Sequence, residues 1–153
     1  MAGIVRLFIA EADRKGRTEC DELVFDNGGI LGDKFHGKNP DRSVLITGRP
    51  AYELADEQGI ALEEGDLGEN ILLDLDPREL EEGCIVRIGE VELEMSRRCP
   101  ICGHLALYDP RLPRLVKDLR GVYLFVRKGG RIDRNSPVKI LINRETEYQG
   151  TEE

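Results

Sequence analysis

CIVRIGEVELEM, residues 84–95, consists of two apolar runs on either side of a Gly-Glu pair. Short runs rich in Val, Ile and Leu predict strands, and a two-residue loop containing glycine predicts a hairpin turn. The same pattern extends in both directions along the chain, and it predicts further strands at residues 4–10, 23–25, 43–47, 70–75, 122–127 and 138–142. Many short strands with glycine-bearing turns favour a β-sandwich or a β-barrel.

Helical patterns are sparser than strand patterns. Residues 49–58 place their small and apolar side chains on one face, with Thr47 as the expected N-cap. A second helix is expected to begin at Cys99 or Pro100, because proline suits the first helical position. A third is expected over residues 114–119, whose leucines and valine share one face. The sequence therefore predicts a mainly-β fold with two or three helices packed on it.

The composition describes one acidic globular domain. A chain of 153 residues suits a single core, and we expect the domain at residues 1–143 and an acidic flexible tail at 144–153. The net charge of −8 argues against general nucleic-acid binding, which needs a broad basic face. No apolar run predicts a membrane span or a secretory signal, so we expect a cytoplasmic protein with reduced cysteines.

RRCPICGH, residues 97–104, holds the residues best suited to chemistry. Cys99 and Cys102 follow two arginines, and a thiol beside fixed positive charge titrates low. A helix beginning near Pro100 would place Cys102 in its first turn, where free backbone N–H groups stabilise a thiolate. We therefore expect Cys102, with Cys99 beside it, to act as a nucleophile or as a ligand of a soft metal.

Three other interpretations of this segment remain open. Cys99, Cys102 and His104 supply part of a zinc site, but zinc needs four ligands and no second closely spaced pair exists. A redox disulfide between the two cysteines is possible, although such motifs usually occur in a βαβ setting. Both thiols can also be buried and act as small apolar side chains.

Further polar residues lie in loops or next to predicted strands. His36 stands between two lysines in a glycine-rich loop, and its pKa range suits acid–base chemistry. Arg42, just before a strand, could bind a phosphate through two parallel hydrogen bonds, or pair with a nearby aspartate on the surface. Glu69 and Asn70, where a loop meets a strand, could bind the polar groups of a ligand or cap the turn.

These segments together resemble the MOSC domains, which are named for the C-terminal part of molybdenum cofactor sulfurases. The resemblance rests on GDKFHG at 32–37, DRSVLI at 41–46, GDLGENI at 65–71, CPICGHL at 99–105, and the segment 121–132 with its paired glycines. The motifs occur in the family's order and span nearly the whole chain. The resemblance implies a closed, strongly bent β-barrel with peripheral helices, similar to the pyruvate-kinase barrel domain.

The resemblance also implies a function. In the family, one cysteine is proposed to accept sulfur as a persulfide or to ligate molybdenum, and the matching position is Cys102. The family's proline directly before that cysteine stands here at Pro100, so Cys99 stays a second candidate. We expect a molybdopterin-type cofactor, with a separate cysteine desulfurase and a molybdoenzyme acceptor as partners. The residues expected to hold the cofactor or stabilise the thiolate are Lys34, His36, Arg42, Glu69, Asn70, Arg97 and Arg98.

Overall fold

The computed structural model describes residues 3–100 and 102–141. The predicted tail at 144–153 and the last residue of the strand predicted at 138–142 lie outside these residues. The strands are β1 (Ile4–Ile9), β2 (Thr18–Cys20), β3 (Glu22–Asp26), β4 (Gly29–Ile30), β5 (Val44–Gly48), β6 (Ile71–Leu73), β7 (Ile85–Ile88), β8 (Val91–Arg98), β9 (Val122–Lys128), β10 (Gly130–Asp133) and β11 (Val138–Leu141).

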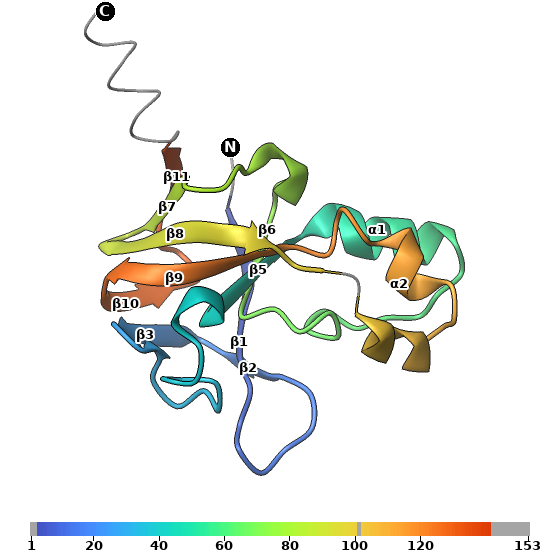
Figure 1. The fold of residues 1–153 in the computed structure, drawn as a ribbon, viewed down its shortest axis with the longest axis horizontal. Coiled ribbons are helices and arrows are strands. Elements are labelled where there is room, and N and C mark those ends of the chain that lie inside the picture. The colour runs from blue at the N-terminus through green and yellow to red at the C-terminus, as the bar shows by residue number, and fades with distance from the viewer. Residues whose placement is uncertain (1–2, 101, 142–153) are drawn as a thin grey trace, which may run out of the picture.

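In the described part of the chain, five short helices connect these strands. They are the α-helices α1 (Arg49–Glu57) and α2 (Leu112–Leu115), and the 3₁₀ turns η1 (Pro40–Arg42), η2 (Pro77–Glu79) and η3 (Gly103–Leu107). The helices α1 and α2 lie together at one end of the strands (Figure 1). No helix among the described residues has the length and apolar character needed to cross a lipid bilayer.

The strands form two sheets. The larger has the order β11-β7-β8-β9-β5-β6-β1-β2 and is antiparallel except between β5 and β6. The smaller has the order β10-β3-β4. The hairpin predicted at residues 84–95 is confirmed, since Ile88 pairs with Val91 across the Gly-Glu turn.

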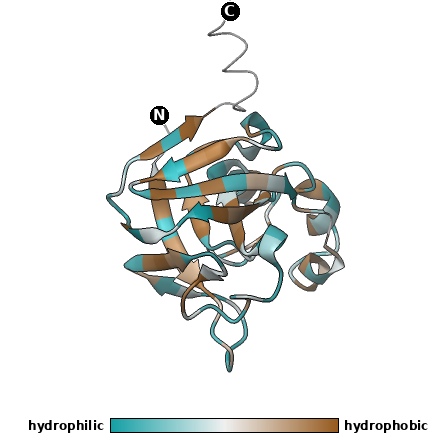
Figure 2. Ribbon diagram, turned by 60° about the vertical axis from the view of Figure 1, so that its left-hand side comes forward, coloured by the Kyte–Doolittle hydropathy of each residue, from teal (hydrophilic) through white to brown (hydrophobic). Residues whose placement is uncertain are grey.

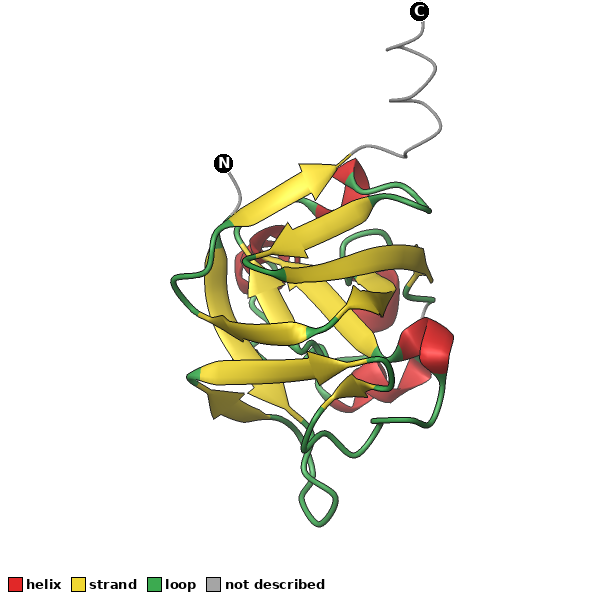
Figure 3. Ribbon diagram, turned by 90° about the vertical axis from the view of Figure 1, so that its left-hand side faces the viewer, coloured by secondary structure: helices red, strands yellow, loops and turns green. Residues whose placement is uncertain are grey.

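The mainly-β prediction is confirmed, but the closed barrel is not. Among the described strands neither sheet closes on itself through hydrogen bonds. Instead β3 contacts β1 and β9, and β10 contacts β8, so the small sheet packs across the curled large one. Figure 3 shows the strands stacked around the core, with most of the helical turns to one side.

One core fills the space between the sheets. Hydrophobic and hydrophilic residues alternate along several strands (Figure 2), as in β8, so one face of these strands turns inward, whereas β5 and β6 are buried on both faces. Val86, Leu93, Leu124 and Ile46 are fully buried there. A second apolar cluster joins α1, α2 and η3 to Leu67, and it fixes the loop before β6 against the helices.

The helix predictions need three corrections. The N-cap of α1 is Gly48, because Thr47 belongs to β5 and donates its hydroxyl to the Arg120 carbonyl oxygen at 2.5 Å. No helix begins at Cys99, whose amide donates to the Gly121 carbonyl oxygen at 3.0 Å and so continues the strand pairing; the next helical turn, η3, begins at Gly103. The helix predicted at 114–119 is the shorter α2, which begins at Leu112.

Candidate functional site

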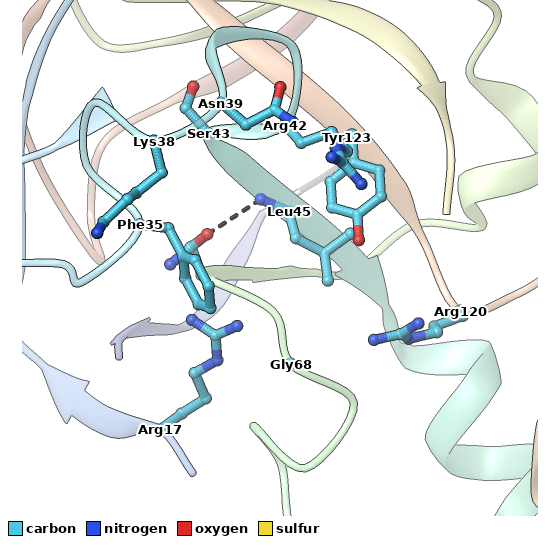
Figure 4. Close-up of a pocket in the computed structure, with 11 residues that line it drawn as sticks. Arg17, Phe35, Lys38, Asn39, Arg42, Ser43, Leu45, Gly68, Arg120 and Tyr123 are labelled. Atoms are coloured by element: carbon cyan, nitrogen blue, oxygen red, sulfur yellow. Dashed lines mark hydrogen bonds between the residues drawn. The ribbon is translucent and has the colours of Figure 1, made fainter. Parts of the chain in front are cut away.

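A cavity of about 250 Å³ opens where β5, the start of β9 and three loops meet (Figure 4). Of the described residues that line it, four are basic and none carries a carboxylate, in a chain whose net charge is −8. A basic pocket in an acidic protein concentrates positive potential at one place. The lining residues are Arg17, Phe35, Lys38, Asn39, Arg42, Ser43, Leu45, Gly68, Asn70, Arg120 and Tyr123.

Asn70 joins three segments at the base of this cavity. Its side-chain oxygen accepts from the Leu45 amide at 3.0 Å, and its nitrogen donates to the Phe8 carbonyl oxygen and to Asp33 Oδ1, each at 3.3 Å. The side chain is almost fully buried. The structure thus brings Asn70 to the cavity, where its hydrogen bonds hold β5, β1 and the loop after β4 together.

Glu69 points away from the cavity although it precedes Asn70. Its buried carboxyl group accepts from the Tyr52 hydroxyl and from the Gly65 amide at 3.1 Å. Burial raises the pKa of Glu69, and the hydrogen bond from Tyr52 opposes that rise. Glu69 therefore stabilises the 65–70 loop from behind and does not line the cavity.

Asp33 fixes the glycine-rich loop beside the cavity. Its carboxylate accepts from the Ala10 amide at 2.7 Å and from the Phe35 amide at 3.0 Å. Phe35 is left 44% exposed at the cavity, with Arg17 5.5 Å and Lys34 5.3 Å from its ring centroid. The loop therefore presents an aromatic ring and a positive charge to any ligand.

Lys34 and His36 do not line the cavity. Lys34 reaches the Phe35 ring, and Lys38 is the lysine of this loop that does line the cavity. His36 Nε2 lies 2.6 Å from Asp26 Oδ1, and this hydrogen bond lowers the pKa of Asp26. The structure does not bring His36 together with Arg42 or Asn70.

Arg42 and Tyr123 form the opposite wall. Arg42 is the last residue of the η1 turn. With the Asn39 side-chain amide oriented so that its oxygen faces donors, that oxygen accepts from Arg42 Nε at 3.0 Å. Tyr123 comes from β9, and its ring has the Arg97 guanidinium 5.8 Å from its centroid. Arg97 therefore lies near Tyr123 but does not itself line the cavity.

Arg98 holds a neighbouring loop. Its guanidinium donates to the carbonyl oxygens of Pro77 at 2.9 Å, Arg78 at 3.3 Å and Leu80 at 2.6 Å. These bonds occupy both terminal nitrogens. In the structure Arg98 joins β8 to the η2 segment and does not line the cavity.

The two thiols differ in exposure. Cys99 is 3% exposed and lies next to Tyr123, which lines the cavity. Burial raises the pKa of Cys99, while the charge of Arg120 and the Tyr123 hydroxyl oppose the rise. The expectation of a low-titrating thiol is therefore wrong for Cys99, since desolvation outweighs the neighbouring positive charges.

Cys102 is half-buried and stands directly before η3 as its N-cap residue. The expected position in the first turn of a helix is therefore wrong. Its side chain packs against the cluster that joins α1 and α2. Within the described part of the chain, no three His, Cys, Asp or Glu side chains form a group suited to a metal ion, and this includes Cys99, Cys102 and His104.

Arg17, Phe35, Lys38, Arg120 and Tyr123 line the cavity but were not singled out from the sequence. Arg120 directly precedes the family-like segment 121–132, and Tyr123 lies within it, so this motif indicated both positions. Arg17 has no local signal, because only the folding of the 10–18 loop beside the Gly65–Asn70 segment brings it there.

The fold and the cavity define a β-rich domain with a basic, carboxylate-free pocket next to a paired-cysteine segment. The family model described as MOSC domain matches residues 32–139, and the chain belongs to the MOSC domain family. Membership of this family supports a general role related to sulfur transfer or to the molybdenum cofactor. A search of curated proteins found no match.

Solved structures share the fold. The YuaD protein from Bacillus subtilis is 21% identical, with a TM-score of 0.74 over 92% of this chain and 96% of that one. YiiM from Geobacillus stearothermophilus is 18% identical, with a TM-score of 0.74 over 92% of this chain and 75% of that one. YiiM from Escherichia coli is 21% identical, with a TM-score of 0.68 over 90% and 70%. At these identities the likeness concerns the fold alone.

Proposed function

We propose that this chain binds a molybdopterin-type cofactor in the basic cavity and carries sulfur toward it on a cysteine thiol. The supporting observation is the charge of the lining, which has four basic side chains and no carboxylate among the residues at 3–100 and 102–141, in a protein of net charge −8. Such a pocket concentrates positive potential and attracts anions. The phosphate of the cofactor is an anion of this kind.

The lining residues fit the cofactor's anionic and ring parts. Arg42 and Lys38 supply charged donors, and Ser43 adds a hydroxyl group. The rings of Phe35 and Tyr123 offer flat surfaces for a planar heterocycle. When bound, molybdenum would supply a centre that accepts soft sulfur ligands.

Cys102 is the proposed sulfur carrier because it is the more exposed of the two thiols. Its thiolate attacks the outer sulfur of a persulfide on a cysteine desulfurase. A new S–S bond forms at Cys102, the donor's S–S bond breaks, and the electron pair leaves on the donor's thiolate, so no oxidant is needed. A molybdoenzyme is the proposed final acceptor.

Cys99 is the second candidate for the sulfur-binding thiol. It lies next to Tyr123, which lines the cavity and so links Cys99 to the proposed cofactor site. Its burial hinders attack on a donor protein but suits a thiol that stays inside. The two candidates are therefore distinguished by which cysteine accepts sulfur from an external donor.

Mass spectrometry after incubation with a cysteine desulfurase and cysteine tests the carrier. We expect the wild-type protein to gain the mass of a sulfur atom, and Cys102→Ala to gain none. Cys20→Ala is the matched control, because Cys20 is also half-buried but lies on β2, away from the cavity lining. No gain on the wild-type protein, or equal gain on Cys102→Ala, contradicts the relay.

A further inference from the structure

Two arginines from distant parts of the chain meet at Gly68. Arg17 precedes β2 and Arg120 precedes β9, and they approach Gly68 from opposite sides (Figure 4). A Cβ atom added to Gly68 would lie 3.4 Å from Arg120 Nη2 and 3.6 Å from Arg17 Nη2. Gly68 has a φ of +90° and carries no side chain, so this point stays open to the cavity that all three residues line.

Both guanidinium groups keep free hydrogen-bond donors. Arg120 Nε donates to the Leu67 carbonyl oxygen at 3.1 Å, which directs the group while leaving Nη2 without a bond to another described residue. Arg17 forms no hydrogen bond with any described residue, and its Nη1 is buried without a partner. Asp33 Oδ1 is 3.7 Å from that nitrogen, which is too far for a hydrogen bond, and it already accepts from the Ala10 amide.

The electrostatics of the pair favour an anion between them. Burial lowers the pKa of Arg17, Asp33 opposes that shift, and the charge of Arg120 adds to it. The positive charges of Arg17 and Arg120 repel each other, and no carboxylate among the described lining residues lies between them. A bound anion would offset this repulsion. Guanidinium N–H groups match the oxygens of phosphate and sulfate, which can accept from both at once.

We propose that Arg17 and Arg120 hold a tetrahedral oxyanion, a phosphate or sulfate group, over Gly68. The oxyanion is either a free inorganic anion or the phosphate end of an organic ester. The subsite lies in the cavity proposed for the cofactor and so deepens that part of the proposed function, but it needs neither cysteine and stands if sulfur transfer fails. Phe35, next to the Arg17 guanidinium, is placed to contact the organic part of an ester.

Calorimetric titration of the full chain with inorganic phosphate at low ionic strength tests the site. We expect saturable binding that weakens about tenfold to a hundredfold in Arg17→Gln and in Arg120→Gln, because each variant loses charge-assisted hydrogen bonds. Arg14→Gln and Arg114→Gln are matched controls that remove the same charge from exposed positions outside the cavity lining. Both controls are expected to bind like the wild-type protein.

Titrations with sulfate and with phenyl phosphate distinguish the two sources. Equal affinities for phosphate, sulfate and phenyl phosphate indicate a free inorganic anion. Phenyl phosphate binding that is about tenfold tighter, with the same dependence on Arg17, indicates an ester. If Arg120→Gln does not fold, Arg17→Gln decides alone, because Arg17 forms no hydrogen bond with the described chain. Absence of saturable binding for all three anions, or wild-type affinity in folded Arg17→Gln, overturns the proposal.

Discussion

The Tyr52 hydroxyl oxygen lies 2.6 and 2.8 Å from the two carboxylate oxygens of Glu69. The same hydroxyl accepts from the Gly65 amide at 2.9 Å and from the Leu67 amide at 3.2 Å. A single side chain of α1 thereby links the buried carboxyl group to the backbone of the loop that ends at Gly68 and Asn70. The position of this loop at the cavity thus depends on a contact made behind it.

Tyr52→Phe is expected to destabilise the protein by about 1–3 kcal/mol, because it removes the hydroxyl that donates to the buried Glu69 carboxyl group and leaves the Leu67 amide without its hydrogen-bond acceptor. Urea unfolding measures the change. Tyr108→Phe is the matched control, since Tyr108 is 44% exposed, and it is expected to cost less than about 0.5 kcal/mol. Equal effects of the two substitutions contradict the structural role of the Tyr52–Glu69 contact.

Glu69 should make the folded state less stable as pH rises. Burial raises its pKa in the folded protein above the ordinary value of 4.5, so the folded state binds more protons than the unfolded state between these two values. Stability from this group is therefore present below pH 4.5 and is lost as pH rises through the folded pKa. The measurement compares unfolding free energies of wild type and Glu69→Gln across this range. A difference that does not change with pH contradicts the raised pKa.

Gly121→Ala is expected to cost at least about 3 kcal/mol, because its φ is +145° and an added Cβ would overlap the Ile46 carbonyl oxygen. Gly59 has a φ of +75° but no atom near an added Cβ, so Gly59→Ala should cost only about 1–2 kcal/mol. Thermal and urea unfolding compare the two variants. Similar losses of stability in the two variants would contradict the overlap, because backbone strain from the positive φ would then account for both.

Cys102 is expected to react with iodoacetamide well before Cys99. Cys99 is 3% exposed and burial raises its pKa, whereas Cys102 is half-buried. Peptide mass spectrometry of samples taken over time gives the two rates. Faster labelling of Cys99 in the folded protein would make Cys99, and not Cys102, the thiol open to an external sulfur donor.

Much of the fold could be predicted from the sequence. Each apolar run predicted as a strand overlaps an observed strand, because strands buried on one or both faces are rich in Val, Ile and Leu. The strands β2, β4 and β10 have only two to four residues and no apolar run, so they could not be predicted. The pairing of the small sheet with the large one depends on contacts distant in sequence.

The candidate site could be predicted only in part. Arg42 and Asn70 lie in family-like motifs, and the structure places both at the cavity. Local charge predicted a low pKa for Cys99, but burial, which no neighbouring residue reveals, outweighs that charge. The meeting of Arg17 with Arg120 joins segments about a hundred positions apart, and it appears only once the chain is folded.

The cofactor content of the purified protein tests the central claim most directly. Protein made in cells that synthesise the molybdenum cofactor is oxidised, and the released pterin is measured by fluorescence. We predict substantial pterin on the wild-type protein, about tenfold less on Arg42→Gln, and unchanged content on Arg87→Gln, whose arginine pairs with Glu92 away from the cavity lining. A wild-type protein without pterin, or equal pterin on Arg42→Gln, would contradict the account.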